Sequence, residues 1–254
     1  MPGLRQIDPH LLSRVAMVPV APVLFAQGKR LRRTTPLLPD AALPWSGRFS
    51  SGTDSAKPAL RLLVLGDSTA AGVGAQTQHD ALPGNLAREL GTRWRMDVAW
   101  TAMGANGATA RDLVERYLTS ATANRYDFVF LSIGANDALG IRSRRAFGRD
   151  IRMILDALRA ASPDATIMMS SLPAFFRFEL LPNPLRFNLY LHSQNLEREA
   201  RRIVASYPGV IMSPPPPPYT EGFFATDLFH PSASGYRDWA EFAVNDAFER
   251  GQLT

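Results

Sequence analysis

The chain has 254 residues, 46% of them hydrophobic and 20% charged, which suits one large globular α/β domain. It contains no cysteine, so disulfide bonds, thiolate catalysis and zinc–thiolate sites are excluded. The formal charge of +5 comes mostly from arginines interleaved with acidic residues, which favours solvated helix faces over a nucleic-acid surface. The arginines assigned to such faces include Arg142, Arg144, Arg145, Arg149, Arg152, Arg198, Arg201 and Arg202.

Residues 1–59 differ in character from the rest of the chain. The segment 11–26 is largely apolar, but it is interrupted by Arg14, Pro19 and Pro22. It is also shorter than the ~20 residues that cross a bilayer, and it lacks the small-residue cleavage site of a secretory signal peptide. We therefore expect an arm that packs on the following domain. Residues 34–58, rich in Pro, Ser and Gly, are expected to form an extended linker.

A basic cluster directly follows the apolar segment and leaves a second interpretation open. In that interpretation the segment lies on a membrane surface, and Lys29, Arg30, Arg32 and Arg33 contact anionic head groups. If the segment crossed the membrane, the positive charges that follow it would hold the rest of the chain on the cytoplasmic side. The expected location is cytoplasmic, with peripheral membrane contact through the arm.

From residue 60 to residue 254, short apolar runs alternate with amphipathic stretches, which predicts one domain with a parallel sheet covered by helices on both faces. The expected strands are Leu60–Leu65, Asp97–Trp100, Phe128–Ile133, Thr166–Ser170 and Val210–Met212. The expected helices carry Leu86 and Leu90, Leu113 and Tyr117 after an N-cap at Thr109, Phe147 to Leu158, Leu196 to Val204, and Trp239 to Phe248. In such sheets the ligand site lies beyond the carboxyl ends of the strands.

The first expected strand ends in Gly66-Asp67-Ser68. A serine between a strand and a helix projects its hydroxyl into the cleft, and we expect the N-terminus of a following helix to favour an oxyanion there. The alternative is a tight turn in which Ser68 only caps the helix. Ala70 stands where a Gly-x-Ser-x-Gly elbow has its second glycine, so the usual α/β-hydrolase turn is disfavoured.

Near the other end of the chain, an aspartate stands three residues before a histidine, at Asp227 and His230. A nucleophilic serine needs a base for its proton, and the base needs a carboxylate that fixes its tautomer and orientation. One tight turn can supply both groups, although a capping aspartate beside a surface histidine gives the same pattern. The other histidines, His10, His79 and His192, have no such neighbour, and we expect structural roles for them.

Two further turns follow expected strands and offer donors for an oxyanion. Gly134-Ala135-Asn136-Asp137 follows a buried strand, so the amide of Asn136 can donate to the developing charge. In the turn after the second strand, Gly104 or Gly107 lets a backbone N–H approach the same place. Ordinary turn chemistry would also account for either motif.

Gly-Asp-Ser, a glycine-rich turn, Gly-x-Asn-Asp and Asp-x-x-His follow successive strands in this order. From about Leu60 to Arg250 the chain therefore resembles the SGNH hydrolase superfamily, also called the GDSL esterases and lipases. The resemblance implies a flavodoxin-like, three-layer α/β/α sandwich with a parallel sheet, and an active site without a metal or another cofactor. It assigns Ser68, Asp227 and His230 to a catalytic triad, and Ser68, Gly107 and Asn136 to an oxyanion hole, with Gly104 as the alternative to Gly107.

The implied function is hydrolysis of carboxylic esters through an acyl-enzyme intermediate on Ser68. The apolar residues 172–181, with Phe223 and Phe224, either line an acyl pocket or pack on the core. We expect small-molecule esters with short-to-medium acyl chains to be preferred over charged substrates. Hydrolysis of thioesters, lysophospholipids or carbohydrate acetates, and acyl transfer, use the same machinery and stay open. A non-catalytic binding module is the alternative from a different class.

Overall fold

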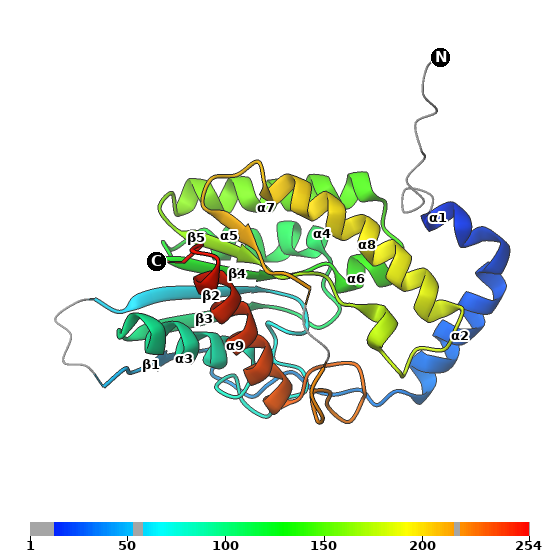
Figure 1. The fold of residues 1–254 in the computed structure, drawn as a ribbon, viewed down its shortest axis with the longest axis horizontal. Helices are drawn as coiled ribbons and strands as arrows, with labels where there is room; N and C mark the ends of the chain where they lie inside the picture. Colours follow the sequence, from blue (N-terminus) through cyan, green and yellow to red (C-terminus); the bar gives the residue numbers. More distant parts are fainter. Residues whose placement is uncertain (1–12, 53–57, 216–218, 254) are drawn as a thin grey trace, which may run out of the picture.

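The computed structural model describes residues 13–52, 58–215 and 219–253. Its centre is a six-stranded sheet of order β1-β3-β2-β4-β5-β6, in which every neighbouring pair is parallel except β1 and β3. The strands are β1 (Ser46–Phe49), β2 (Leu60–Gly66), β3 (Val98–Gly104), β4 (Phe128–Ser132), β5 (Thr166–Met169) and β6 (Val210–Met212). Helices cover both faces, which gives the three layers that the sequence predicts (Figure 1).

Two groups of helices enclose the sheet. On one face lie α3 (Leu82–Trp94) and α9 (Ala233–Glu249). On the other lie α7 (Arg144–Ala161), α8 (Leu185–Val204) and a segment that runs from α4 (Ala110–Asp112) through a π-helical turn (Leu113–Tyr117) to α5 (Leu118–Ala121). The short helix α6 (Ala135–Leu139) follows β4, and a 3₁₀ turn (Phe175–Arg177) follows β5. Thr109 caps α4 as predicted, because its hydroxyl accepts the N–H of Asp112.

The central strands are recognisable as unbroken apolar runs because both of their faces are covered. β4 is entirely buried, and Arg61 is the only exposed residue of β2. Successive side chains of β2 enter different core layers, since strand side chains alternate between the two faces. Leu63 and Leu65 pack with α7 and α8, whereas Leu62 and Val64 pack with α3 and α9.

The order of the strands places three loops at one end of the sheet. From β2 the chain adds β3 on one side and then crosses to β4 on the other, so the direction of strand addition reverses between β2 and β4. Open α/β sheets bind ligands at such a reversal, outside the carboxyl ends of the strands. The segments that meet there contain Ser68 and Gly107 in loops and Asn136 in the short helix α6.

Strand β1 corrects the expectation that residues 34–58 form only an extended linker. It pairs antiparallel with β3, from Ser46 opposite Thr101 to Phe49 opposite Val98. Gly47 lies so close to the ring of Trp100 that a Cβ there would approach it within 2.5 Å. Four residues with this composition carry no strand pattern of their own, and the pairing depends on the neighbouring strand.

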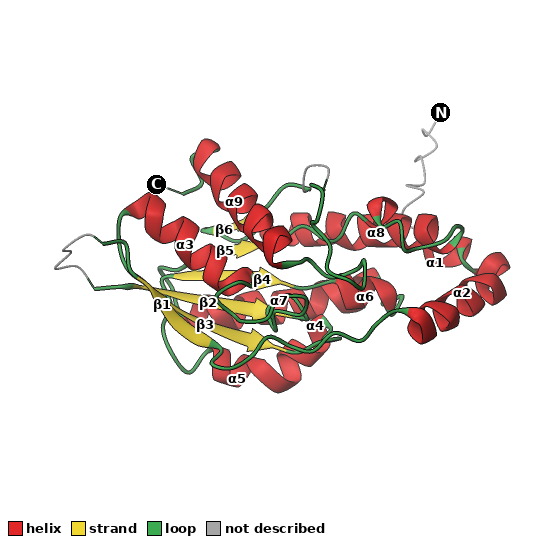
Figure 2. Cartoon of the chain, turned by 90° about the horizontal axis from the view of Figure 1, so that it is seen from below, coloured by secondary structure: helices red, strands yellow, loops and turns green. Residues whose placement is uncertain are grey.

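The described part of the N-terminal segment is helical. α1 (Ser13–Ala16) and a 3₁₀ turn (Val18–Val20) lead into α2 (Ala21–Thr34), which lies beyond the end of the sheet to which β2 and β4 point (Figure 2). Leu31 of α2 packs against the core on the α7–α8 face. Among the described residues, no helix combines the length and the apolar character needed to cross a membrane. His10 and the start of the apolar segment at Leu11 lie outside the described residues.

Candidate active site

Three side chains from two distant segments form a continuous hydrogen-bonded chain beyond the carboxyl ends of the strands. Oγ of Ser68, just after β2, lies 3.0 Å from Nε2 of His230, and Nδ1 of His230 lies 2.6 Å from Oδ2 of Asp227. Ser68 and Asp227 are buried, while the His230 side chain keeps 14% of its surface exposed. The structure therefore brings together the three residues that the sequence assigns to a triad.

The loop that carries Asp227 and His230 holds the carboxylate from two sides. Oδ1 of Asp227 accepts the N–H groups of Phe229 and His230, both at 3.0 Å, while Oδ2 faces the imidazole. Leu228 between them adopts a left-handed φ of 55°, a conformation that costs a non-glycine residue roughly 1–2 kcal/mol. Burial raises the pKa of Asp227, but the hydrogen bonds outweigh it and hold this pKa below its ordinary value, so the carboxylate stays ionised.

The backbone after Ser68 contradicts the expectation of a helix at this point. Residues 68–74 form consecutive turns, and the next helix, α3, begins only at Leu82. Gly72 and Gly74 have φ angles of 73° and 99°, which lie outside the helical region. The prediction of a helix dipole acting on Ser68 is therefore wrong, and the backbone N–H groups beside its hydroxyl belong to a turn.

Two glycines let the strand ends approach one another closely beside Ser68. A Cβ on Gly66 would lie 2.2 Å from the carbonyl oxygen of Ser132, and a Cβ on Gly104 would lie 2.2 Å from that of Gly66. Gly107 differs, because open space surrounds it and its φ of 81° is what requires glycine. Gly104 thus has a packing role, and Gly107 is the stronger candidate for an oxyanion donor.

Asn136 links the loop after β4 to the loop after β3. Its Nδ2 donates to the carbonyl oxygen of Ala108 at 3.0 Å, one residue beyond Gly107. An amide nitrogen carries two hydrogens, so one contact to the backbone is compatible with a second to a ligand. The structure therefore joins the Asn136 amide to the Gly107 turn in a single assembly.

A buried ion-pair network that sequence reasoning missed supports the same two loops. Oδ2 of Asp137 accepts the N–H of Ala110 at 2.9 Å, which ties α6 to the start of α4. Oδ1 of Asp137 lies 2.7 Å from Nη1 of Arg142, whose Nη2 lies 2.6 Å from Asp150. Both carboxylates are completely buried, so the expectation that Arg142 lies on a solvated helix face is wrong. No local sequence pattern marks this network, because Asp137 and Asp150 come from different segments and meet Arg142 only in the fold.

The remaining arginines assigned to helix faces are more exposed than Arg142, and several pair with acidic residues. On α7 the side chains of Arg144 and Arg152 reach Glu199 of α8, at 3.6 and 3.3 Å. Arg149 pairs with Asp150, its neighbour in the sequence. Each of these arginines therefore has an acidic partner within the molecule, as the interleaving of arginine and acid in the sequence indicates.

Asp67, directly before Ser68, faces the interior. Its Oδ1 accepts the N–H and the hydroxyl of Thr69 at 3.1 and 3.0 Å, and that hydroxyl lies 2.7 Å from Oγ of Ser132. Burial raises the pKa of Asp67 to about 6, although the Thr69 hydrogen bonds and the nearby His230 lower it. This carboxyl therefore changes its charge in mildly acidic solution.

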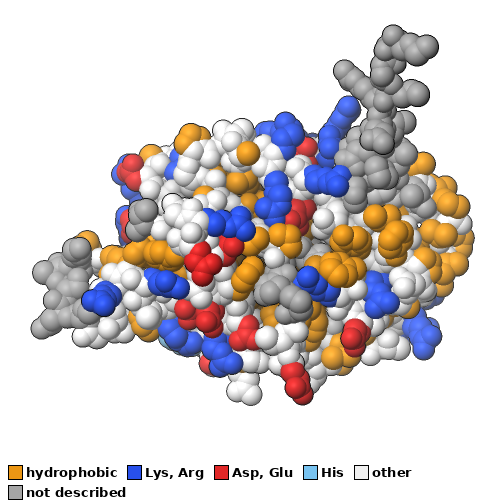
Figure 3. Space-filling model, viewed as in Figure 1, with side chains coloured by type: hydrophobic (Ala, Val, Ile, Leu, Met, Phe, Trp, Pro, Cys, Tyr) orange, Lys and Arg blue, Asp and Glu red, His pale blue; other side chains and the backbone are white. Residues whose placement is uncertain are grey.

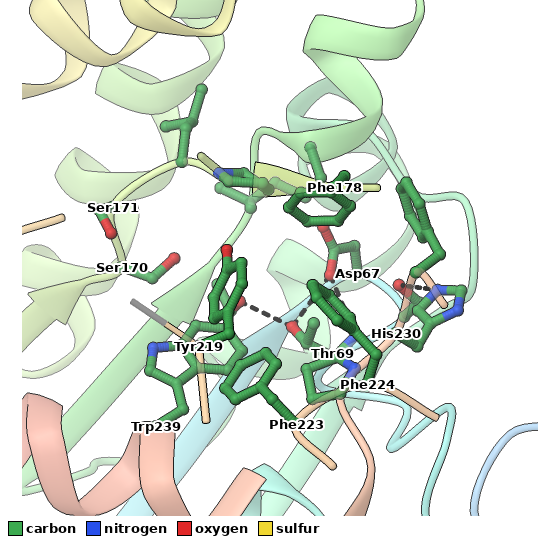
Figure 4. A pocket seen from close by; sticks show the side chains of 18 residues that line it. Asp67, Thr69, Ser170, Ser171, Phe178, Tyr219, Phe223, Phe224, His230 and Trp239 are labelled. Atoms are coloured by element: carbon green, nitrogen blue, oxygen red, sulfur yellow. Dashed lines mark hydrogen bonds between the residues drawn. The ribbon is translucent and has the colours of Figure 1, made fainter. Parts of the chain in front are cut away.

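A small cavity of about 90 Å³ opens beside Ser68 and His230, with largely aromatic walls (Figure 4). Its walls include Leu172, Pro173, Phe178, Tyr219, Phe223, Phe224, Phe229 and Trp239. The sequence left pocket lining and core packing open for residues 172–181, and here they do both, since Leu172 and Phe178 also belong to the core. Tyr219 and Trp239 were not predicted, because only the folded chain brings them to this cavity.

A second serine–histidine contact joins the N-terminal segment to α8. Oγ of Ser13 lies 3.0 Å from Nδ1 of His192, and Nε2 of His192 lies 3.1 Å from the carbonyl oxygen of Arg142. Because a carbonyl can only accept, Nε2 carries the hydrogen and Nδ1 accepts from Ser13. Both residues are buried, and burial lowers the pKa of His192. This imidazole bridges a hydroxyl and a carbonyl, which is a structural anchor.

Comparison with known proteins identifies the family to which these motifs point. The sequence model of the GDSL-like lipase/acylhydrolase family matches residues 64–237. This range contains Ser68, Gly107, Asn136, Asp227 and His230. The chain is similar to a GDSL-like esterase of Mycobacterium tuberculosis, with 26% identity over 74% of this chain. It spans 62% of the length of that relative.

Solved structures share the architecture at low sequence identity. The extracellular lipase of Streptomyces rimosus is 17% identical, with a TM-score of 0.58 over 74% of this chain and 100% of the lipase. The psychrotrophic esterase EstA of Pseudoalteromonas sp., inhibited by monoethylphosphonate, is 16% identical, with a TM-score of 0.55 over 75% of this chain and 97% of the esterase. These likenesses confirm the α/β fold that the sequence predicts.

Proposed function

The chain belongs to the GDSL-like lipase/acylhydrolase family, and on this premise we propose that it is a serine esterase that hydrolyses carboxylic esters of small molecules. The observation that carries the proposal is the unbroken contact from Ser68 through His230 to Asp227 beside an apolar cavity. In this arrangement the hydroxyl has its base, and the base has its orienting carboxylate.

In the first half-reaction, Nε2 of His230 takes the proton of Ser68 while Oγ bonds to the ester carbonyl carbon. The tetrahedral intermediate then collapses, the bond to the alcohol oxygen breaks, and His230 protonates the departing alcohol. Water attacks the acyl-enzyme with His230 again as base, which releases the acid and restores Ser68. Asp227 stays ionised and stabilises the imidazolium, a role that its lowered pKa supports.

The negative charge of the tetrahedral intermediate falls to the backbone N–H groups of Ser68 and Gly107 and to the amide of Asn136 in this proposal. Donors fixed before the reaction stabilise such charge effectively, because they need no reorganisation when it develops. The contact from Asn136 to Ala108 supports this assignment, since it fixes the amide beside the Gly107 turn.

The first prediction is that Ser68→Ala abolishes ester hydrolysis while the protein still folds. Without the nucleophile, turnover of p-nitrophenyl butyrate should fall by roughly 10³-fold or more. Ser120→Ala, which alters an exposed serine of α5, is the matched control and should keep wild-type turnover. Full activity in Ser68→Ala would refute the assignment of the nucleophile.

The aromatic cavity beside Ser68 supports the expected preference for short-to-medium acyl chains. Its volume of about 90 Å³ is small, and its walls are mainly apolar, so a charged acyl group would lose hydration without a partner. A panel of p-nitrophenyl esters of graded chain length, with a serine-reactive phosphonate as inhibitor, tests this preference. Faster hydrolysis of charged esters than of butyl or hexyl esters would contradict it.

The same panel separates the alternatives. A binding module would leave every ester intact and would not react with the phosphonate. A thioesterase, lysophospholipase, carbohydrate acetylesterase or acyltransferase would react with the phosphonate but would turn over its own substrate class faster than the simple esters. The contact between Ser68 and His230 supports an enzyme, since a binding site has no need of it.

We propose that residues 1–59 act as an arm whose strand β1 adds an edge to the sheet, that residues 60–254 form the catalytic domain, and that the arm contacts the membrane peripherally. The described part of the arm exposes the hydrophobic residues Val15, Val18, Val23 and Phe25. Lys29, Arg30 and Arg33 are exposed one to two turns further along α2. Apolar side chains beside basic ones are what binding to an anionic bilayer surface requires. The cytoplasmic location stays a prediction.

A further inference from the structure

A second cavity, much larger than the aromatic one, lies between the N-terminal arm and the catalytic domain. It measures about 910 Å³ and has predominantly apolar walls. Pockets of 300–1,000 Å³ commonly bury small-molecule ligands, so this volume suits a substrate rather than a few waters. Hydrophobic side chains gather at this end of the molecule, at the right of Figure 3. We call this cavity the arm groove.

One face of α2 forms the outer wall of the arm groove. Leu24, Gly28 and Leu31 line it at a spacing of three to four residues, followed by Thr35 after the helix. These are half-buried positions, while most of the remaining residues of α2 are exposed. The helix therefore turns its apolar stripe toward the domain, yet it buries no residue completely. Apolar surfaces that face each other across unfilled space forgo contacts that a ligand would supply.

The inner wall belongs to the domain and leads to the candidate active site. Ile141 and Leu189 lie on this wall, and Asp227, His230 and Asn106 line it as well. Phe229 and His230 border both the arm groove and the small aromatic cavity. The imidazole of His230 therefore lies between two apolar cavities of unequal size. An ester bound at Ser68 could place its acyl half in one cavity and its alcohol half in the other.

Two contacts to the α8 region hold the described helices of the arm. In the middle of α2, Nε2 of Gln27 donates to the carbonyl oxygen of Asn183 at 2.7 Å, and its Oε1 accepts the N–H of Leu185 at 3.1 Å. In α1, the hydroxyl of Ser13 lies 3.0 Å from Nδ1 of His192. These hydrogen bonds hold α2 at a defined distance from the domain, so the arm groove has a defined shape.

We propose that the arm groove binds the long aliphatic chain of an ester whose carbonyl lies at Ser68. This proposal rests on the esterase function proposed above. Each buried methylene favours binding by up to about fourfold, so a chain of several carbons gains much from these walls. The chain can belong to the acyl half or to the alcohol half of the ester, and the two sources are distinguished by experiment.

The second prediction uses Gly28, which has open space around the position of a Cβ. Gly28→Phe directs a ring into the arm groove, which Gly28 lines, and helix interiors favour phenylalanine over glycine. Ala26→Phe is the matched control, because it adds the same ring to an exposed position on the opposite side of α2. With the chain on the acyl side, kcat/KM for p-nitrophenyl dodecanoate relative to the butyrate should fall at least roughly tenfold in Gly28→Phe. In Ala26→Phe this ratio should match the wild type.

Dodecyl acetate and ethyl acetate test the alcohol half in the same way. A selective loss for dodecyl acetate places the chain on the alcohol side, which agrees with the proposed preference for short-to-medium acyl chains. A selective loss for the dodecanoate places it on the acyl side and would contradict that preference. Equal chain-length ratios in wild type and Gly28→Phe for both pairs of esters would overturn the proposal.

A binding measurement keeps the arm groove separate from the catalytic assignment. Ser68→Ala protein is titrated with a fluorescent dodecyl probe, with and without Gly28→Phe. Weaker binding in the double variant supports the arm groove even if the wild type hydrolyses no ester, whereas equal binding overturns it. Absence of ester turnover in the wild type contradicts only the proposed function.

Discussion

At the scale of single residues, Asp67 and Ser68 show how neighbours in one turn meet opposite environments. The hydroxyl of Ser68 faces His230 at the cavity, while the carboxyl of Asp67 is buried against Thr69. Burial disfavours the ionised form of a carboxyl, which is why the pKa of Asp67 rises to about 6. The titration of Asp67 therefore affects the stability of the fold around the nucleophile.

The third prediction concerns this titration. The folded pKa of about 6 exceeds the ordinary value of 3.8, so between these pH values the folded protein keeps a proton that the unfolded chain has lost. The contribution of Asp67 is therefore greatest below about pH 4, and it is lost as the pH rises toward 6. The loss amounts to about 3 kcal/mol in the free energy of unfolding.

Chemical denaturation of the wild type and Asp67→Asn between pH 4 and pH 7 measures this contribution. The stability of the wild type relative to the variant should decline by that amount over this range. Asp40→Asn, at an exposed position, is the matched control. Parallel pH profiles for wild type and Asp67→Asn would show that Asp67 is ionised in both states.

The residues proposed for the chemistry could be predicted from sequence better than the residues that support them. Ser68, Asp227 and His230 stand in motifs whose residue types and spacing indicate acyl transfer. Gly66 and Gly104 need to be glycine only because neighbouring strands approach them, and no local pattern records that contact. The burial of Arg142 could not be predicted either, since the two carboxylates that surround it come from different segments.

At the scale of elements, the short helix α6 and the turn before α4 are held together by Asp137. This side chain receives the N–H of Ala110 and the guanidinium of Arg142, so it fixes the loops of Asn136 and Gly107 relative to each other. It does not touch the reacting atoms in the proposed mechanism. We therefore describe it as a positioning residue.

The fourth prediction is that Asp137→Asn lowers kcat more than it raises KM. The amide can still accept the N–H of Ala110, but it leaves Arg142 with less compensating charge. We expect kcat to fall roughly tenfold, because misplaced oxyanion donors lose part of their effect. Stability should fall by about 1–3 kcal/mol, a common cost for a weakened buried contact.

Steady-state kinetics and thermal unfolding measure the two effects separately. Asp156→Asn removes a carboxylate that accepts the hydroxyl of Tyr207, outside the loops after β3 and β4 in the sequence, and serves as the control. An unchanged kcat at reduced stability would limit Asp137 to a structural role.

Helices and strands were predicted correctly where burial sets the pattern of apolar residues in the sequence. They were missed where a segment's structure depends on contacts with another part of the chain. The central strands β2 and β4 have both faces covered, so their unbroken apolar runs were sufficient. Strand β1 depends on its partner β3, and no local pattern shows it. The helix expected after Ser68 is absent because Gly72 and Gly74 take positive φ angles, which a glycine permits but does not dictate.

At the scale of the whole molecule, the arm combines exposed hydrophobic side chains with a basic stretch of α2 at the end where the arm groove lies. An ester with a long chain dissolves preferentially in a bilayer. Contact between the arm and a membrane would therefore bring the arm groove close to such a substrate.

The fifth prediction is that anionic vesicles bind this protein through the arm. Replacing Lys29, Arg30 and Arg33 with glutamine should weaken partitioning roughly a hundredfold, since each basic residue near the surface contributes about 1 kcal/mol. Replacing the exposed Arg125, Arg237 and Arg250 removes the same charge elsewhere and is the matched control. Sedimentation with phosphatidylserine vesicles measures both variants, and equal weakening in the two would assign binding to net charge rather than to the arm.

The sequence predicted the layers of the molecule and the end of the sheet that carries the site. It did so because alternating strands and helices restrict the topology, and ligand sites in such sheets lie beyond the carboxyl ends of the strands. The arm groove could not be predicted in this way. It arises from the separation between α2 and the domain, and that separation depends on contacts such as Gln27 with Asn183, far apart in the sequence.

The tight turn from Asp227 to His230 makes the imidazole and its carboxylate a single mechanical unit. Two backbone N–H groups of the same turn grip Asp227, so the pair keeps its internal geometry when the loop moves. The distance between Nε2 of His230 and Oγ of Ser68 then determines whether the proposed triad can transfer a proton. A ligand or partner that displaced this loop slightly would lengthen that distance and stop the proposed reaction, without unfolding any part of the domain.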